Sequence, residues 1–432
     1  MITVEESVVD PHQGRAVTED KYENETNGQM RSEKKKSRKE GKRIDVAYDK
    51  LAITVGCYSQ TFGTKGVKEN AFFMKDVGDA RRIRTRILEC FEIANLPTTS
   101  DKLREQLLNF AIVGGGPTGM EFAAELSDLV REDLNRLVPG LISKVAITVY
   151  DVAPTVLSMF DEKLSKYAME TFRREGVKIK TSHHIEELRP GLPRTDDSKE
   201  DMDDVADSQG CYTLTTKEDG DVGVGLCVWS TGNMMNPFVQ KALSKTYTYP
   251  STSAKHTSGT APSELATNQW MIEKHPKTGA ITVDDRLRIQ LYSQTPDPTE
   301  TTNPPSPASK ATLTSVFALG DNATLHTHPL PATAQTANQQ ALYLAHHLNA
   351  PSPTSPPFTY RNMGIMTYIG NAKGVVQTEG WMGDLSGRAA WLVWRGAYLS
   401  MSLSWRNRVL MVVYWYVFVF CFSGRGGGQG GG

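Results

Sequence analysis

The sequence predicts an α/β fold whose centre is a parallel sheet. The first observation is a strand, turn and helix at 109–126, in which an apolar run leads into a glycine turn and then into apolar residues at helical spacing. The second is the alternation that follows, with strands at 145–151 and 177–181 around an amphipathic helix at 162–175. Strands and helices that alternate in this way form parallel sheets with helices on their faces.

The glycine turn carries the strongest chemical signal. Gly114, Gly116 and Gly119 have the GxGxxG spacing. In this arrangement the first glycine permits a tight turn, the second lets backbone N–H groups approach a pyrophosphate, and the third lets helix and strand pack closely. The helix N-terminus adds unpaired N–H donors and the positive end of its dipole. Because a strand precedes and a helix follows, the turn predicts a dinucleotide site.

The strand at 145–150 ends in Asp151, which we expect to accept a hydrogen bond from the adenine ribose 2′-OH. Asp151 lies farther from Gly119 than the usual ~20 residues, because the helix is long and a loop at 139–141 follows it. A carboxylate here repels a 2′-phosphate, so NADH is favoured over NADPH. An aspartate that only caps the next turn stays open as the alternative.

Composition narrows the class of protein. A chain of 432 residues with 39% apolar content is long enough for two or three domains with sizeable cores. The net charge of −1 gives no field that would recruit nucleic acid, so we predict no nucleic-acid partner, and the basic run at 31–43 is interpreted as a solvated loop. The five cysteines lack metal-binding spacing, so we predict neither a metal site nor a disulfide framework. A reducing compartment fits this pattern.

Three further strands end in small residues. The segment 51–56 is a buried strand that ends at Gly56, after a predicted hairpin of 2–4 with 44–48. The strand at 226–229 runs into Ser230, Thr231 and Gly232, which can approach a bound cofactor without steric conflict.

The third of these strands, 315–319, ends in Gly320 and Asp321. Gly320 admits the backbone of a ligand, and Asp321 can accept hydrogen bonds from ribityl or ribose hydroxyls. The position of this strand, after a complete dinucleotide unit and before a long helix, favours a flavin as the ligand. An ordinary strand end is the alternative.

The helix at 330–345 has Pro331 near its expected start. Gln335 and Gln339 are four residues apart and share a face of the helix. From this face both side-chain amides can form hydrogen bonds to a ring that carries carbonyl groups at its edge. The alternative is an exposed polar face. Two polar segments, 251–268 and 293–309, are expected to be insertions without regular structure, and between them 281–289 alternates like a half-buried strand pair.

The C-terminal region from 391 to 422 is apolar and rich in aromatic residues. Its last continuous apolar run, 409–422, has 14 residues, which is shorter than the ~20 that a spanning helix needs. Arginines interrupt the region, so we expect an amphipathic helix that anchors at a membrane surface. A buried core helix is the alternative.

These motifs together resemble the type II (alternative, non-proton-pumping) NADH:ubiquinone oxidoreductases of fungal mitochondria, which are pyridine-nucleotide flavoproteins. The resemblance runs from about residue 48 to residue 422. It rests on the segments 48–51, 111–125, 229–232, 318–321, 330–340, 368–370 and 391–406.

The resemblance implies a two-dinucleotide-binding (Rossmann-like) flavoprotein fold with FAD and NADH as cofactors. It assigns FAD to Thr54, Gly56, Gly320 and Asp321; NADH to Gly114, Gly116, Gly119, Asp151, Thr231 and Gly232; and ubiquinone to Gln335 and Gln339. It also places Glu121 near the nicotinamide. An ordinary first-turn glutamate, favoured by the helix dipole, is the alternative.

The same resemblance implies a location and a domain plan. We expect a protein attached peripherally to the mitochondrial inner membrane, with self-association into a homodimer left open. Family members begin with a further glycine turn for FAD, so we expect an N-terminally truncated chain whose FAD domain is incomplete. The expected parts are 1–106 (partial FAD domain and connection), 107–245 (NADH domain), 246–349 (return to the FAD domain, with the quinone-side helix) and 350–432 (membrane anchor). A non-catalytic remnant that binds NADH and membrane but no flavin is the competing hypothesis.

Overall fold

The computed structural model describes residues 2–5, 43–193, 210–246, 254–258, 269–294, 309–349, 356–378, 383–402 and 404–413. The chain divides into two compact units. Unit 1 contains the residues up to 64, then 73–82 and 231–362, and unit 2 contains 65–72, 83–230 and the residues from 363 onward. The boundaries expected at 106, 245 and 349 stay predictions.

Unit 2 is built on the predicted parallel sheet, which has the strand order β5-β12-β6-β7-β8. Its strands are β5 (Phe72–Phe73), β6 (Asn109–Val113), β7 (Ala146–Tyr150), β8 (Val177–Lys180) and β12 (Leu226–Trp229). β12, β6, β7 and β8 are each parallel to their neighbours. Ile112, Val149 and Val228 are fully buried, as expected for a parallel sheet that is covered on both faces. The predicted α/β class is therefore confirmed.

Helices surround this sheet. They are α1 (Val67–Asn70), α2 (Val77–Ala94), α3 (Asp101–Leu107), α4 (Pro117–Asp128), α5 (Asn135–Leu137), α6 (Pro139–Ile142) and α7 (Glu162–Arg174). Between α4 and α5 the residues Leu129–Leu134 form a π-helical turn. The helix α3 is not among the predicted elements. Its signal is Ser100, whose Oγ accepts a hydrogen bond from Leu103 N at 3.2 Å and caps the helix.

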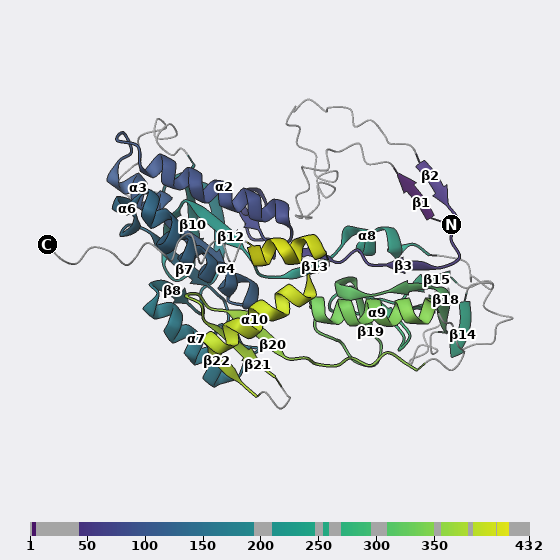
Figure 1. Cartoon of the computed structure of the whole chain (residues 1–432). Coiled ribbons are helices and arrows are strands. Elements are labelled where there is room, and N and C mark those ends of the chain that lie inside the picture. Colours follow the sequence, from purple (N-terminus) through teal and green to yellow (C-terminus); the bar gives the residue numbers. More distant parts are fainter. Residues whose placement is uncertain are drawn as a thin grey trace, which may run out of the picture. The chain divides into compact units, whose positions relative to one another are not determined.

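Unit 2 also has two antiparallel sheets. One has the order β11-β10-β9, from β9 (Ile185–Pro190), β10 (Tyr212–Thr216) and β11 (Gly220–Val224). The other has the order β20-β21-β22, from β20 (Ile365–Tyr368), β21 (Gly374–Gln377) and β22 (Leu385–Gly387), and leads into α10 (Arg388–Met401). β20 and α10, coloured yellow, lie beside α4 in Figure 1, and β20 packs on this helix.

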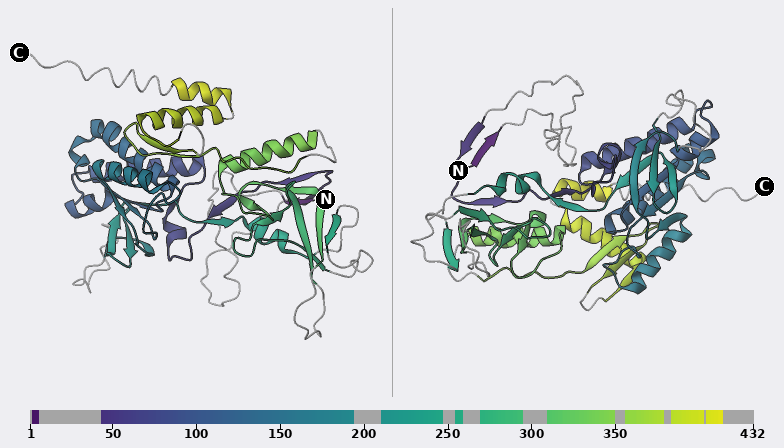
Figure 2. Two further views of the ribbon diagram at one scale, coloured as in Figure 1. Left: turned by 90° about the horizontal axis from the view of Figure 1, so that it is seen from below. Right: turned by 180° about the vertical axis from the view of Figure 1, so that it is seen from behind.

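Unit 1 is built on a mixed sheet with the main order β14-β18-β17-β16-β19. β15 also pairs with β17, and β3 pairs with β18. The strands are β3 (Leu51–Ile53), β14 (Ala254–Ser258), β15 (Gln269–Ile272), β16 (Ile281–Val283), β17 (Arg288–Gln294), β18 (Lys310–Ala318) and β19 (Ala323–Leu325). The helix α9 (Ala334–Asn349) covers this sheet (Figure 2), and its Leu344 joins a core that includes Trp270 and Phe317.

The remaining elements of unit 1 are two short strand pairs and a helix. β1 (Ile2–Glu5) pairs antiparallel with β2 (Arg43–Val46), which confirms the predicted N-terminal hairpin. β4 (Cys57–Ser59) pairs antiparallel with β13 (Asn233–Met235), and α8 (Pro237–Gln240) follows. The basic run up to residue 42 lies outside the described residues.

Three expectations for unit 1 are wrong. The helix α9 begins at Ala334 and not near Pro331, because Thr333 Oγ1 accepts a hydrogen bond from Thr336 N at 3.3 Å and caps it there. The polar segment 251–268 contains a regular strand, β14, because β18 offers it an edge to pair with. The strand pair expected at 281–289 is present, since β16 pairs antiparallel with β17. β16 is, however, fully and not half buried, because Ile281 and Val283 lie in the apolar core of unit 1 and Thr282, on the other face, is buried as well.

Replacing Gly119 by Ala tests the packing of α4 on the sheet. A Cβ at Gly119 would overlap the carbonyl oxygen of Gly114 and the Oγ of Ser230. We expect the free energy of unfolding in urea to fall by about 1–3 kcal/mol, the usual cost of overpacking. Gly140→Ala is the matched control, since a Cβ there meets nothing within 4 Å. Equal stability of the two variants would show that α4 can move away at no cost.

Candidate dinucleotide and flavin sites

The glycine turn joins β6 to α4, and each of its three predicted glycines has a distinct environment. Gly114 has a φ of 116°, which favours glycine, and its N–H donates to Tyr150 O at 2.8 Å. A Cβ on Gly116 would meet nothing within 4 Å, so the space beside the helix N-terminus is open. Gly119 contacts the turn too closely for any side chain. These environments fit the pyrophosphate of a dinucleotide.

Asp151 follows β7 directly and lies beside this turn. One of its carboxylate oxygens accepts a hydrogen bond from Gly115 N, and the other accepts one from Ala153 N at 2.7 Å. The aspartate therefore caps the next turn, which was the alternative interpretation, and also steadies the glycine turn. Each carboxylate oxygen can accept a further hydrogen bond, so a ribose contact is compatible with this geometry. That contact stays a prediction.

Ser230, which the sequence predicts only as a small residue near a cofactor, also bonds the end of β6 and the glycine turn. Its Oγ lies 2.9 Å from Val113 O and 3.3 Å from Gly114 O, so it can donate to the last carbonyl of β6 or to the first of the turn. The predicted Thr231 and Gly232 follow it along the chain but belong to unit 1. There, Gly232 has a φ of 77°, and its carbonyl accepts a hydrogen bond from Gln60 N at 3.2 Å.

The four residues predicted to hold the flavin come together in unit 1. They are Thr54, Gly56, Gly320 and Asp321, and they follow β3 and β18, which are adjacent and parallel. Ligands of α/β proteins commonly bind at such carboxyl ends. Asn322, which was not predicted, joins the two ends: its Nδ2 donates to Ile53 O at 3.1 Å, and its Oδ1 accepts from Gly56 N at 3.4 Å.

The chemistry of this edge fits a group that carries hydroxyls. Gly56 has open space where a Cβ would lie, and the carboxylate of Asp321 offers acceptors. One of these acceptors already bonds Cys57, whose Sγ donates at 3.2 Å. Burial raises the pKa of the Cys57 thiol, with the hydrogen bond to Asp321 acting in the same direction, so the thiol form is favoured.

Gln335 and Gln339 lie on one face of α9, as predicted, and both amides bond the segment at 360–361. Tyr360 Oη donates to Gln335 Oε1 at 2.8 Å. Gln339 Nε2 donates to Arg361 O at 2.9 Å, and its Oε1 accepts from Arg361 N at 3.0 Å. Both side chains are half-buried, so this is not a simple exposed polar face. A role toward a quinone stays a prediction.

Glu121 is engaged in a way that an ordinary first-turn glutamate is not. Its Oε1 accepts hydrogen bonds from Tyr368 N and from Trp394 Nε1, both at 3.1 Å. The pKa of this carboxyl is raised above its ordinary value because the group is buried, and the two hydrogen bonds offset only part of that rise. One turn further along α4, burial and then the negative charges of Asp128 and Glu121 raise the pKa of Glu125 to about 7. Proximity of Glu121 to a nicotinamide stays a prediction.

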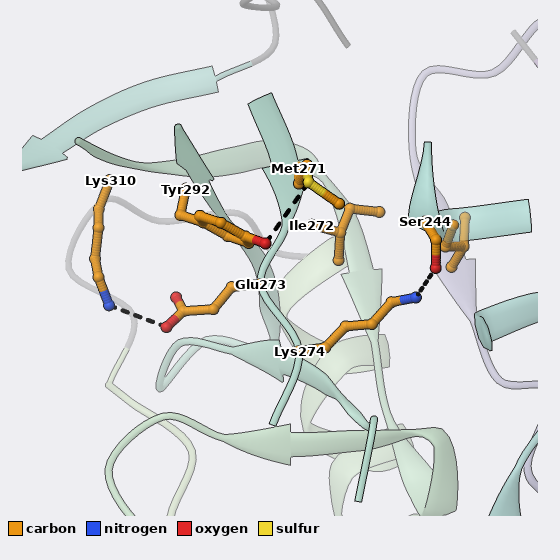
Figure 3. Close-up of a pocket in the computed structure, with 8 residues that line it drawn as sticks. Ser244, Met271, Ile272, Glu273, Lys274, Tyr292 and Lys310 are labelled. Atoms are coloured by element: carbon orange, nitrogen blue, oxygen red, sulfur yellow. Dashed lines mark hydrogen bonds and ion pairs between the residues drawn. The ribbon is translucent and has the colours of Figure 1, made fainter. Parts of the chain in front are cut away.

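A separate pocket of about 370 Å³ lies in unit 1 (Figure 3) and contains none of the predicted site residues. Its polar groups are largely engaged within the protein. Lys274 Nζ donates to Val239 O at 2.5 Å and to Ser244 Oγ at 2.6 Å, so it caps the end of α8. Lys310 and Glu273 form an ion pair at 3.0 Å. We therefore place the candidate chemistry at the strand ends and not in this pocket.

The C-terminal region is described only as far as residue 413. In the described part of the chain, no helix is long and apolar enough to cross a membrane. Several large apolar side chains of α10 and of the helical segment 405–413 are exposed: Leu392, Tyr398, Met401, Trp405, Val409, Leu410, Val412 and Val413. The predicted anchor continues to residue 422, outside the described residues.

Two family models match the chain. The model described as pyridine nucleotide-disulphide oxidoreductase matches residues 11–248, and the model of the NDH2 C-terminal domain matches residues 363–425. The second match contains β20–β22 and α10.

Curated relatives match most of the chain. A probable NADH dehydrogenase of Dictyostelium discoideum is 34% identical, over 87% of this chain and 68% of the relative. The mitochondrial external NADH-ubiquinone oxidoreductase 2 of Saccharomyces cerevisiae is 29% identical, over 86% and 62%. The mitochondrial external alternative NAD(P)H-ubiquinone oxidoreductase B2 of Arabidopsis thaliana is 31% identical, over 87% and 71%. The chain thus spans about two thirds of the length of these relatives.

A solved structure, that of NDH2 from Plasmodium falciparum in complex with NADH, has the same fold. Its TM-score is 0.65 at 20% sequence identity, and the match covers 88% of this chain and 79% of that one. The family model covers more than half of the chain, and the Dictyostelium discoideum relative shares a third of the aligned residues. The chain therefore belongs to the pyridine nucleotide-disulphide oxidoreductases and, within them, to the type II NADH dehydrogenases, NDH2.

Proposed function

We propose that this protein is an FAD-dependent oxidoreductase that transfers electrons from NADH to ubiquinone without pumping protons. The observation that carries the proposal is the glycine turn between β6 and α4, with the carboxylate of Asp151 against its Gly115 N–H. The names of the yeast and plant relatives, which are NADH- or NAD(P)H-ubiquinone oxidoreductases, support the substrates. The non-pumping part rests on the family resemblance.

The proposed NADH site lies in unit 2. The open backbone at Gly116 and the N-terminus of α4 receive the pyrophosphate, because their N–H groups and the helix dipole favour an anion. Asp151 accepts a hydrogen bond from the ribose 2′-OH. Ser230, bonded to the end of β6, keeps the turn in the shape that this contact needs.

The proposed flavin site lies at the strand ends of β3 and β18 in unit 1. FAD supplies the chemistry, which is acceptance of a hydride from NADH and passage of the electrons to a quinone. The protein residues orient it: Gly56 and Gly320 allow close approach, and Asp321 accepts hydrogen bonds from hydroxyls. Asn322 holds the two strand ends together.

Gln335 and Gln339 are the proposed hydrogen-bonding groups for the quinone. Since both amides bond the segment at 360–361, they are held in fixed orientations. We also propose that exposed apolar residues of the C-terminal region attach the protein to the surface of the mitochondrial inner membrane, where ubiquinone is dissolved. Relatives named as mitochondrial support this location.

The nucleotide preference is tested by Asp151→Asn, which removes the charge and keeps one acceptor oxygen. We expect the ratio of kcat/KM for NADPH to that for NADH to rise by about tenfold, because the repulsion of a 2′-phosphate is lost. Asp161→Asn, which removes an exposed carboxylate before α7, is the control and should leave the ratio unchanged. An unchanged ratio in Asp151→Asn as well would refute the ribose assignment.

The quinone assignment is tested by Gln339→Leu in protein loaded with FAD. Leucine keeps the helix and roughly the volume but leaves a quinone carbonyl unpaired, at a cost of about 0.5–1.5 kcal/mol. We therefore expect slower ubiquinone reduction but normal NADH oxidation with a soluble acceptor that takes electrons directly from the flavin. The control is Asn338→Leu, an exposed neighbour on the same helix.

Equal losses with ubiquinone and with the soluble acceptor would move the quinone site elsewhere. The same preparation tests the whole proposal, because protein that shows no flavin absorbance bands after addition of FAD is not the proposed enzyme. That result would favour the non-catalytic remnant.

Membrane attachment is tested by the double substitution Trp405→Ser and Val409→Ser. The two side chains are 77% and 58% exposed, so their loss removes apolar surface without opening a cavity. We expect weaker co-sedimentation with phospholipid vesicles and normal activity with the soluble acceptor. Leu137→Ser, 72% exposed and outside the C-terminal region, is the control. Equal sedimentation of all variants would exclude these residues from the membrane contact.

A further inference from the structure

The C-terminal segment of unit 2 holds Glu121, a residue of the nucleotide-binding helix. Glu121 lies two residues after Gly119, in the first turns of α4. Its Oε1 receives two N–H groups from that segment, the backbone N–H of Tyr368 in β20 and the indole N–H of Trp394 in α10. Residues more than 240 positions away along the chain therefore set the position of this carboxylate.

The indole of Trp394 cannot easily turn away from Glu121. Its ring stacks on Tyr368 with 5.3 Å between centroids, and it contacts Tyr398 at 4.8 Å on its own helix. Rings held between two aromatic neighbours have few accessible orientations. The direction of the Nε1–H bond is thus determined by packing within the C-terminal segment.

A second attachment lies two turns further along α4. Asp128 accepts a hydrogen bond from the Tyr368 hydroxyl, and the backbone N–H of Asn371 lies 3.2 Å from both of its carboxylate oxygens. Residues seven apart lie on the same face of a helix. Two attachments on one face resist both rotation of α4 about its axis and tilting of its N-terminus.

These attachments matter at the N-terminus of α4, where the N–H groups that would bind a pyrophosphate begin after Gly116. Rotation of the helix changes the direction of those N–H groups. A released Glu121 carboxylate would also bring a negative charge within about one turn of a bound anion, which opposes binding.

We propose that Trp394 is a positioning residue for NADH binding, acting through its hydrogen bond to Glu121. The inference rests on the proposed function, because it takes NADH as the ligand of the glycine turn. It gives the C-terminal segment a second role, in shaping the nucleotide site, beside the proposed attachment to a membrane.

Trp394→Phe tests the proposal, because it keeps an aromatic ring between Tyr368 and Tyr398 but removes the N–H donor. We expect the Kd for NADH, titrated without quinone, to rise by about tenfold, the scale of one hydrogen bond to a charged group. The kcat with a soluble acceptor at saturating NADH should stay within about twofold. Trp391→Phe is the matched control, since its ring contacts Arg395 at 4.1 Å and not Glu121.

A double-mutant cycle with Glu121→Leu measures the coupling between Trp394 and Glu121 in NADH binding. If Trp394 acts through Glu121, Trp394→Phe adds less than about twofold to the Kd in the Glu121→Leu background. The ¹H–¹⁵N resonance of the Trp394 indole should also shift on Glu121→Leu, while that of Trp391 stays in place.

The outcomes separate the two proposals. Unchanged NADH affinity in Trp394→Phe, or equal losses in Trp394→Phe and Trp391→Phe, would overturn the positioning role alone. A lower kcat at unchanged Kd would also overturn it, because the indole would then act on turnover and not on binding. Failure of the unsubstituted protein to bind NADH would overturn the proposed function and this inference together.

Discussion

The close contact of Gly119 with Gly114 and Ser230 is the constraint on which the nucleotide site depends. It lets α4 approach the end of β6 at a distance that no side chain would allow. Because α4 lies there, Gly116 is left open at the helix N-terminus and the Gly115 N–H meets Asp151. The absence of a side chain at Gly119 thus places the open helix N-terminus beside the carboxylate of Asp151.

The acidic face of α4 is the second organising feature of unit 2. Glu121, Glu125 and Asp128 would destabilise one another on an isolated helix. Burial raises the pKa of Glu125 to about 7, and the negative charges of Asp128 and Glu121 act in the same direction. The C-terminal segment supplies compensating donors from Tyr368, Asn371 and Trp394. The match to the NDH2 C-terminal domain contains these three donors, so a segment that is distant along the chain completes the hydrogen bonding of α4.

In unit 1 a single side chain, Asn322, also joins segments that are far apart along the chain. The residues that are predicted to hold the flavin come from two strand ends that are more than 260 positions apart, and parallel pairing of β3 with β18 brings them together. Asn322 bonds across this junction. Gln340, one position beyond the predicted Gln339, accepts the N–H of Gly320 at 2.8 Å and so ties α9 to the same place.

The sequence by itself determined the α/β class, the glycine turn and the positions of the strands along the chain around that turn, because hydrophobic periodicity and glycine spacing are local properties. It also located Asp151 directly after a strand, since strand ends can be read from the chain; the ribose contact stays a prediction. Only the tertiary structure revealed that Ser230, Asn322, Gln340 and Trp394 support these sites. Their hydrogen-bond partners lie between 20 and 273 residues away, so no local pattern marks them. The strand β14 could not be predicted within a polar segment either, because an edge strand is stabilised by the strand with which it pairs in the fold.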